Sequence, residues 1–439
     1  MRVLTHIARS GWEKIRRERR RIDPKPASTA GFFATAHLED RILELSQRVQ
    51  AIKESPTLAV TARAARLKAE GRDIIGLGAG EPDFDTPQHI KNAAKKAIDD
   101  GFTKYTPVGG IPGLKNAIVA KFKRDNGFDY SVKEIIVGVG GKQCIFNLAL
   151  AVLNPGDEVI IPAPYWVSYA DIALVAEAKP VIVDCGIEQG FKITPAQLEA
   201  AITPKTKIFM INSPSNPTGA VYTLDELKAL GEVLKQHPHI LVATDDMYEH
   251  VNLSGAKFVN ILNAAPELKD RTVVLNGVSK AYSMTGWRIG YAAGPEKIIK
   301  AMEILQSQST SNPTSISQVA AQAALEGDQA CIDPMVKAFR ERHEFVVRRF
   351  NEMPGLKCIQ AGGAFYAFPD ARPAIADLHR RGVIAEATDM ALSEYLLEKT
   401  GVAVVPGSAF GAEGYFRISF ATSMDNLRNA LDRIQQALK

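Results

Sequence analysis

The 439-residue chain has few cysteines, and the four that it contains are widely separated: Cys144, Cys185, Cys331 and Cys358. No pair has CxxC spacing, and the eight histidines form no HExxH or similar cluster, so the sequence offers no recognisable metal site. No apolar stretch approaches the ~18 residues that a membrane helix needs. This cysteine usage fits reduced thiols, and we expect a cytoplasmic protein without a metal ion.

Positive charge is in excess only at the start of the chain. Residues 1–40 hold nine Lys and Arg against five Asp and Glu, a surplus that accounts for the whole net charge of +4. The rest is neutral in sum and shows no electrostatic footprint for nucleic acid. We expect residues 1–44 to form a basic, poorly ordered extension. Organelle targeting stays open as an alternative, although Glu13, Glu18 and Asp23 are unusual in transit peptides.

Seven short apolar runs rich in β-branched residues alternate with amphipathic segments. The runs cover residues 135–137, 158–161, 180–183, 207–211, 240–243, 272–275 and 289–293. They show little polar alternation, as strands buried on both faces should. Helix-start signals at Thr194 and Thr223 lie between them. We therefore predict an α/β fold with a mainly parallel seven-stranded sheet flanked by helices, whose ligands gather at the carboxyl ends of the strands.

Lys280 lies in a turn-rich segment between two of these runs, with Arg288 close behind it. Buried lysines lose their charge readily and form imines with aldehydes. An arginine nearby can hold a phosphate in a bidentate grip. This pair is what pyridoxal phosphate requires, although the segment alone is also consistent with a surface lysine and an arginine at the edge of the core.

Four further strand ends carry groups that match other parts of such a site. They are the glycine-rich turn Gly138–Lys142 for the phosphate, Trp166 as a stacking ring, Asn216 as a donor to a ring hydroxyl, and Asp245 as the partner of a protonated pyridine nitrogen. Each has an ordinary alternative, such as a tight turn, a core aromatic or, for the neighbouring Asp246, a helix N-cap. All five groups falling at strand ends together favours the cofactor site.

With these residues in place, the chain from about Leu45 onward resembles the fold-type-I pyridoxal-phosphate aminotransferases, and within them the bacterial and plastid-type aspartate aminotransferases. The motifs that carry this resemblance are residues 80–87 (GEPDFDTP), 104–106 (KYT), 212–219 (NSPSNPTG), 279–280 (SK), 286–288 (GWR) and 416–419 (FRIS).

The resemblance implies a role for each candidate residue. Lys280 is expected to bind the cofactor and move the substrate proton. Asp245 is expected to face the ring nitrogen, with Tyr248 and Asn216 at the ring hydroxyl and Trp166 stacked on the ring. The expected phosphate-binding residues are Gly140, Gly141, Lys142, Ser279, Arg288 and, from a neighbouring subunit, Tyr105. The expected substrate-binding residues are Gly80, Trp166, Asn216, Arg417 at the α-carboxylate, Lys142 at a distal carboxylate and Lys53 for prephenate.

The same resemblance implies a homodimeric transferase of amino-acid metabolism with shared active sites. The expected reaction converts L-aspartate and 2-oxoglutarate to oxaloacetate and L-glutamate, with ping-pong kinetics, and includes prephenate as a further substrate. An aminotransferase for aromatic or neutral amino acids and a related lyase remain alternatives. A regulator built on such a domain would need a DNA-binding domain ahead of it, for which a 40-residue extension is too short.

We expect two domains after the extension. Residues 86–325 should form the large cofactor-binding domain, and residues 45–85 together with 326–439 should form a smaller α+β domain. Within the smaller domain the pattern predicts helices at 334–350 and 424–438 and a strand at 362–368.

Overall fold

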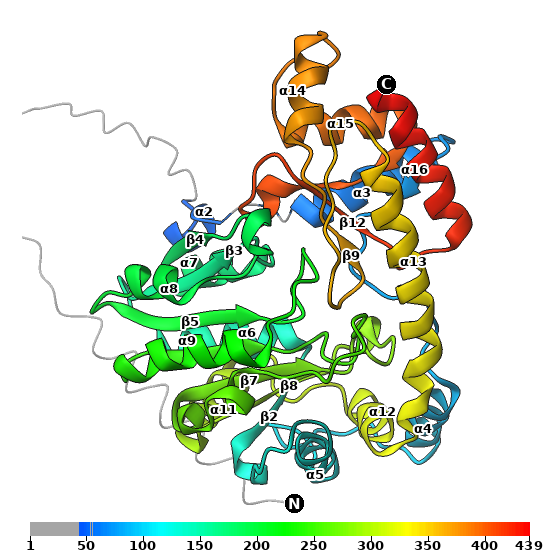
Figure 1. The fold of residues 1–439 in the computed structure, drawn as a ribbon. Coiled ribbons are helices and arrows are strands. Elements are labelled where there is room, and N and C mark those ends of the chain that lie inside the picture. Colours follow the sequence, from blue (N-terminus) through cyan, green and yellow to red (C-terminus); the bar gives the residue numbers. More distant parts are fainter. Residues whose placement is uncertain (1–43, 53, 55) are drawn as a thin grey trace, which may run out of the picture. The chain divides into compact units, whose positions relative to one another are not determined.

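A seven-stranded sheet organises the chain in the computed structural model, which describes residues 44–52, 54 and 56–439 (Figure 1). The strands are β2 (Ile135–Gly138), β3 (Glu158–Ala163), β4 (Lys179–Asp184), β5 (Thr206–Asn212), β6 (Leu241–Asp245), β7 (Thr272–Gly277) and β8 (Gly290–Ala293). Their order is β2-β8-β7-β6-β5-β3-β4, and only β8 runs antiparallel to its two neighbours. The predicted mainly parallel α/β sheet, with all seven strands, is confirmed.

Both faces of the sheet are buried, because successive side chains along a strand point to opposite sides. On β2, Ile136 packs into one apolar cluster, whereas Ile135 and Val137 pack into another. The first cluster includes residues of α6 (Gly141–Val152), α7 (Ser168–Val175) and α11 (Glu296–Ser309). The second includes residues of α4 (Gln88–Asp99), α5 (Pro112–Lys121), α8 (Pro195–Ala201), α9 (Leu224–Gln236) and α12 (Ser315–Glu326). Helices on both faces explain why the strand sequences lack polar alternation.

The two predicted helix starts are confirmed. Thr223 accepts a hydrogen bond from the backbone N–H of Glu226, whose side chain accepts one from the backbone of Thr223 in return. Thr194 and Gln197 form the same capping box at the start of α8. Each box satisfies two backbone donors that a helix start otherwise leaves unpaired.

The residues that flank the large sheet in sequence form two smaller sheets. β1 (Ile75–Gly76) pairs in parallel with β10 (Val402–Ala403), and β12 (Phe416–Ser419) lies between β11 (Val405–Pro406) and β9 (Tyr366–Ala367). The predicted helices are present as α13 (Asp333–Asn351) and α16 (Met424–Leu438). The division into two domains near residues 85 and 326 stays a prediction.

The strand expected at 362–368 is much shorter than predicted, since only β9 forms a strand within it, and Gly363 forms an isolated bridge with Asn252. Gly362 and Gly363 instead donate backbone hydrogen bonds to Gly219, and Ala364 has a positive φ of 58°. A left-handed residue breaks the extended backbone, so the chain follows the 212–219 loop before it enters the sheet.

The remaining elements are short or lie at the edges of the fold. They are α2 (Gln47–Gln50), α3 (Pro56–Ala69), α10 (Ile261–Ala264), α14 (Arg372–Arg380), α15 (Asp389–Thr400), the π-helical turn η1 (Phe122–Asn126) and the 3-10 turns η2 (Val132–Glu134), η3 (Ile187–Gln189), η4 (Pro266–Arg271), η5 (Thr285–Trp287), η6 (Gln329–Ile332) and η7 (Gly407–Phe410). No helix among the described residues is both long and apolar enough to cross a membrane. The basic extension, apart from Glu44, and Lys53 lie outside the described residues.

Candidate active site

A cavity of about 410 Å³ opens where the carboxyl ends of β5, β6 and β7 meet the sheet that contains β12. Eleven of the predicted site residues line it: Gly80, Gly141, Lys142, Trp166, Asn216, Asp245, Tyr248, Ser279, Lys280, Arg288 and Arg417. Strand ends are where ligands bind in sheets of this type. The structure therefore brings together residues that are up to 337 positions apart in the sequence.

Lys280 follows β7 and points into this cavity. Its Nζ donates a 2.5 Å hydrogen bond to the backbone oxygen of Gly80 and lies 5.7 Å from the centre of the Tyr248 ring. Burial and, to a smaller extent, the positive charge of Arg417 lower the pKa of Lys280 to about 8. More of this amine is uncharged near neutral pH than for an exposed lysine, so it is a competent nucleophile and base.

Glycines bring an arginine and a helix start together at one end of the cavity. Gly140 caps α6 with a φ of 81°, and a Cβ at this position would overlap the Arg288 guanidinium. A Cβ on Gly290 would overlap the backbone of Gly140 and Gly141. The free N–H groups of a helix start and a guanidinium beside them form an anion site. The sequence does not reveal the need for Gly290, because that need arises from a helix start that is distant in sequence.

Asp245 ends β6 with its carboxylate buried beneath the cavity. Oδ2 accepts a 2.6 Å hydrogen bond from the Tyr169 hydroxyl, and Oδ1 accepts one of 3.2 Å from the backbone N–H of Met247. Desolvation raises the pKa of Asp245, and no lysine or arginine of the described chain forms an ion pair with it. A buried carboxylate that faces a cavity is suited to a cationic ligand atom.

The alternative reading of Asp246 as a helix N-cap is wrong. Its two carboxylate oxygens accept hydrogen bonds from Thr244 at 2.7 Å and from Asn260 at 2.7 Å, and no described helix begins there. Burial raises the pKa of Asp246 to about 7.

Arg417 on β12 reaches the opposite side of the cavity and is 2% exposed. Its guanidinium donates to Asn216 Oδ1 at 2.8 Å and to the Gly78 backbone oxygen at 2.6 Å. It lies between the Tyr366 and Phe410 rings, 4.4 and 4.9 Å from their centres. Nε has no hydrogen-bond partner, and among the described residues no carboxylate pairs with this cation. The site is therefore prepared for an anion.

Two predicted residues of the cavity lining, Trp166 and Lys142, lie close together. Trp166 meets Tyr169 edge to face at 5.3 Å, and Lys142 Nζ lies 5.0 Å from the Trp166 ring centre. Partial burial and the nearby Arg288 lower the pKa of Lys142. A cation at Lys142, in addition to the Arg417 guanidinium, fits a ligand with two carboxylates.

The structure does not bring Tyr105 into this cavity. Its side chain is 94% exposed, and the predicted role depends on a second subunit. Conversely, sequence inspection missed Tyr169, which orients Asp245, and Tyr366, whose hydroxyl is 2.8 Å from that of Tyr248. Tyr169 lies three residues after Trp166, in the first turn of α7, which begins at Ser168.

The residues present fit pyridoxal phosphate. A nucleophilic amine, an anion site built on glycines, a buried carboxylate without a cation and an indole ring surround one cavity. Fold and site together define an enzyme of the pyridoxal-phosphate type built on a fold-type-I sheet.

Comparison with known proteins gives the family. Residues 72–434 match the model for aminotransferase class I and II. A Nitrosomonas europaea protein named aspartate/prephenate aminotransferase is 65% identical over 396 residues, which make up 90% of this chain and 100% of that protein. Solved structures of aspartate aminotransferases are also similar. The one from Rhizobium meliloti has a TM-score of 0.84 at 49% identity and covers 90% of this chain and 98% of that one. The one from Thermus thermophilus with maleate has a TM-score of 0.84 at 43% identity and covers 90% and 99%. This chain belongs to the class I and II aminotransferases, which depend on pyridoxal phosphate.

Proposed function

We propose that the protein transfers the amino group of L-aspartate to 2-oxoglutarate, which yields oxaloacetate and L-glutamate. The observation that carries this proposal is the buried Arg417 guanidinium, which has no carboxylate partner among the described residues and shares a cavity with Lys280. The names of the relatives from Nitrosomonas, Rhizobium and Thermus support aspartate as the donor. The first of these names also supports prephenate as a second acceptor.

The cofactor would be held by the residues at the strand ends. Gly140, Gly141, Ser279 and Arg288 would bind its phosphate, with Lys142 near the same helix start. Asp245 would face the ring nitrogen and keep it protonated, which suits its buried, cation-free carboxylate. Trp166 would stack on the ring, and Tyr248 and Asn216 would bind the ring hydroxyl. When bound, the cofactor supplies an electron sink for the bonds of the substrate α-carbon.

The chain's own residues would position the substrate and move its proton. Arg417 would bind the α-carboxylate, and Gly80 would bring its backbone close to the substrate. Lys280 Nζ would take the proton from the substrate α-carbon and return it to the cofactor carbon C4′. Orientation of the reacting bond by a fixed guanidinium accounts for much of the rate in such sites.

Aspartate added to the purified protein tests this proposal. The absorbance band of the lysine-bound cofactor is expected to shift to that of the amino form, with release of one oxaloacetate per site. 2-Oxoglutarate added next should restore the first band, as ping-pong kinetics require. A protein that carries the cofactor but shows the shift only with alanine or phenylalanine would support the alternative of neutral or aromatic substrates. Release of ammonia or another fragment in place of a 2-oxo acid would support a lyase.

Lys142 is proposed to read the distal carboxylate of the substrate. We expect Lys142→Ser to lower kcat/KM for aspartate by about tenfold to a hundredfold, the range of one charge-assisted hydrogen bond. The value for alanine, which has no distal carboxylate, should change by less than about threefold. The measurement is kcat/KM for both amino acids, with Lys257→Ser at an exposed site as the matched control. An equal loss for both substrates would assign Lys142 to the cofactor phosphate alone.

The proposal includes a homodimer in the cytoplasm, with Tyr105 of one subunit at the phosphate of the other. The Tyr105 side chain is 94% exposed and is therefore accessible to a partner subunit. Sedimentation should give twice the 47.7 kDa of one chain. A monomer with full activity would exclude the shared site.

A further inference from the structure

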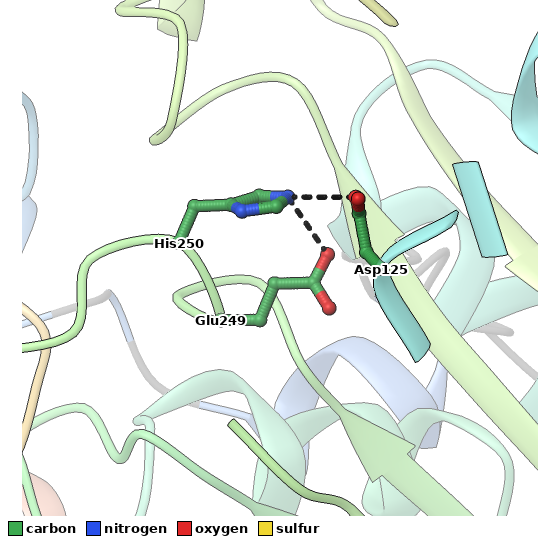
Figure 2. Close-up of side chains that lie close together, drawn as sticks. All are labelled: Asp125, Glu249 and His250. Carbon is green, nitrogen blue, oxygen red and sulfur yellow. Dashed lines mark ion pairs between the residues drawn. The ribbon is translucent and has the colours of Figure 1, made fainter. Parts of the chain in front are cut away.

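Behind the turn that carries Tyr248, four charged side chains meet away from the cavity. Figure 2 shows the His250 ring directed at Asp125 and Glu249, with Nε2 3.4 Å from Asp125 Oδ2 and 3.2 Å from Glu249 Oε1. The Lys121 ammonium contacts Glu249 directly and lies 3.9 Å from Asp125. We call these four residues the charge cluster.

The charge cluster is not suited to bind a metal ion. The Lys121 ammonium already neutralises Glu249, and it is 0% exposed, so it has no path by which to leave. The charged form of His250 is favoured as well, because the two carboxylates raise its pKa to about 9. Two carboxylates facing two cations leave no net negative charge to attract a further one.

Both oxygens of Glu249 are held by amides from different parts of the fold. Asn126, at the end of the π-helical turn η1, donates to Oε2 at 2.9 Å and accepts from Lys121 at 2.9 Å. Asn276 on β7 donates to Oε1 at 2.9 Å, which leaves its own oxygen to accept from the Gly277 backbone N–H at 2.7 Å. Glu249 thus ties three segments to one carboxylate.

Two of those segments lead directly to the cofactor site. Tyr248 precedes Glu249 in the turn after β6, and Lys280 follows Asn276 by four residues in the segment after β7. A buried ion pair is a poor source of stability, because an apolar pair of similar volume often does as well. The carboxylate instead fixes geometry. Each of its oxygens orients one side-chain amide, and each amide thereby positions the backbone segment that carries it.

We propose that Lys121 and Glu249 are positioning residues that hold the Tyr248 turn and the Asn276–Lys280 segment in register with each other. The inference rests on the proposed function, since it assigns a purpose to the alignment of Tyr248 and Lys280. Its consequence is that loss of the pair alters the cofactor site even where the fold survives.

The test uses the holoenzyme of Glu249→Gln and of the double variant Lys121→Met/Glu249→Gln, which carries no unpaired charge between these two positions. We expect kcat to fall by about tenfold to a hundredfold in both, as for a small misplacement of catalytic groups, with KM for aspartate changed less than about threefold. The pH midpoint of the bound-cofactor absorbance should also shift, because it reports the surroundings of Lys280. The control is Leu431→Ala in α16, a 0% exposed position that lies outside the charge cluster and the cavity lining. It shows how far a loss of stability alone changes kcat and the absorbance midpoint.

Three results decide the inference. A lower melting temperature with unchanged kcat and an unchanged absorbance midpoint in the double variant would reduce the charge cluster to a stabilising element. A fall in kcat and a shift of the absorbance midpoint in Leu431→Ala as large as those in the double variant, at an equal loss of melting temperature, would also overturn the proposal. A wild-type protein without any cofactor band would contradict the proposed function itself. A wild-type band together with an unchanged band and kcat in every variant would contradict only the positioning role.

Discussion

Replacing Lys280 with alanine is expected to lower kcat by about a thousandfold to ten-thousandfold, the largest effect of any substitution at the site. This amine is the group proposed to bind the cofactor covalently and to carry the substrate proton. Arg288 and the glycine turn would still bind the phosphate, so the variant should retain the cofactor through non-covalent contacts. Its absorbance should then be that of the free aldehyde, and borohydride should no longer fix the cofactor to the chain.

The pH dependence of wild-type cofactor binding gives a second measurement on the same residue. The pKa of Lys280 is lowered to about 8 by burial, so the uncharged, reactive amine accumulates as pH rises through that value. The rate of cofactor attachment to the cofactor-free protein should therefore rise between about pH 7 and 9 and then level off. For an exposed lysine, the rate of attachment would keep rising up to about pH 10. Lys300→Ala, at an exposed lysine of α11, should leave rate and spectrum unchanged. An unaltered band in Lys280→Ala would overturn the assignment.

The sequence was sufficient for the large sheet because each of its strands is buried on both faces and reads as an unbroken apolar run. It also indicated Asp245 and Lys280 as site residues, because a charged residue a few positions after such a run lies near the strand ends where ligands bind. The smaller sheets could not be predicted in the same way. β1, β9, β10 and β11 contain two residues each, too few for a period to show, and β9 follows a backbone that is bent at Ala364.

The residues missed at the site share a different cause. Tyr169, Tyr366 and Glu249 act through contacts with residues from other elements, and nothing adjacent in the sequence marks them. Gly290 is required by the close approach of Gly141 from another strand end. Local pattern reports burial and turns, whereas a hydrogen bond between distant elements becomes visible only once the elements have packed.

Replacing Arg417 with glutamine is expected to lower activity without lowering stability. The guanidinium is buried without a carboxylate partner, and removal of such a charge relieves a desolvation cost, so the melting temperature of the substrate-free protein should stay the same or rise. Activity should fall, because the α-carboxylate loses a bidentate, buried ion pair worth about 3–5 kcal/mol. This predicts a loss of kcat/KM for aspartate of about a hundredfold to several thousandfold.

A dicarboxylate separates the two effects. Maleate should raise the melting temperature of the wild-type protein, since a ligand that binds only the folded state stabilises it. The Arg417→Gln protein should show little of this increase at the same concentration. Arg428→Gln, on the exposed side of α16, is the matched control and should respond like the wild type. Equal stabilisation of the wild type and Arg417→Gln by maleate would place the carboxylate on Lys142 or Arg288 instead. If Arg417 lowers the stability of the substrate-free protein but is required for ligand binding, it is a residue retained for binding rather than for stability.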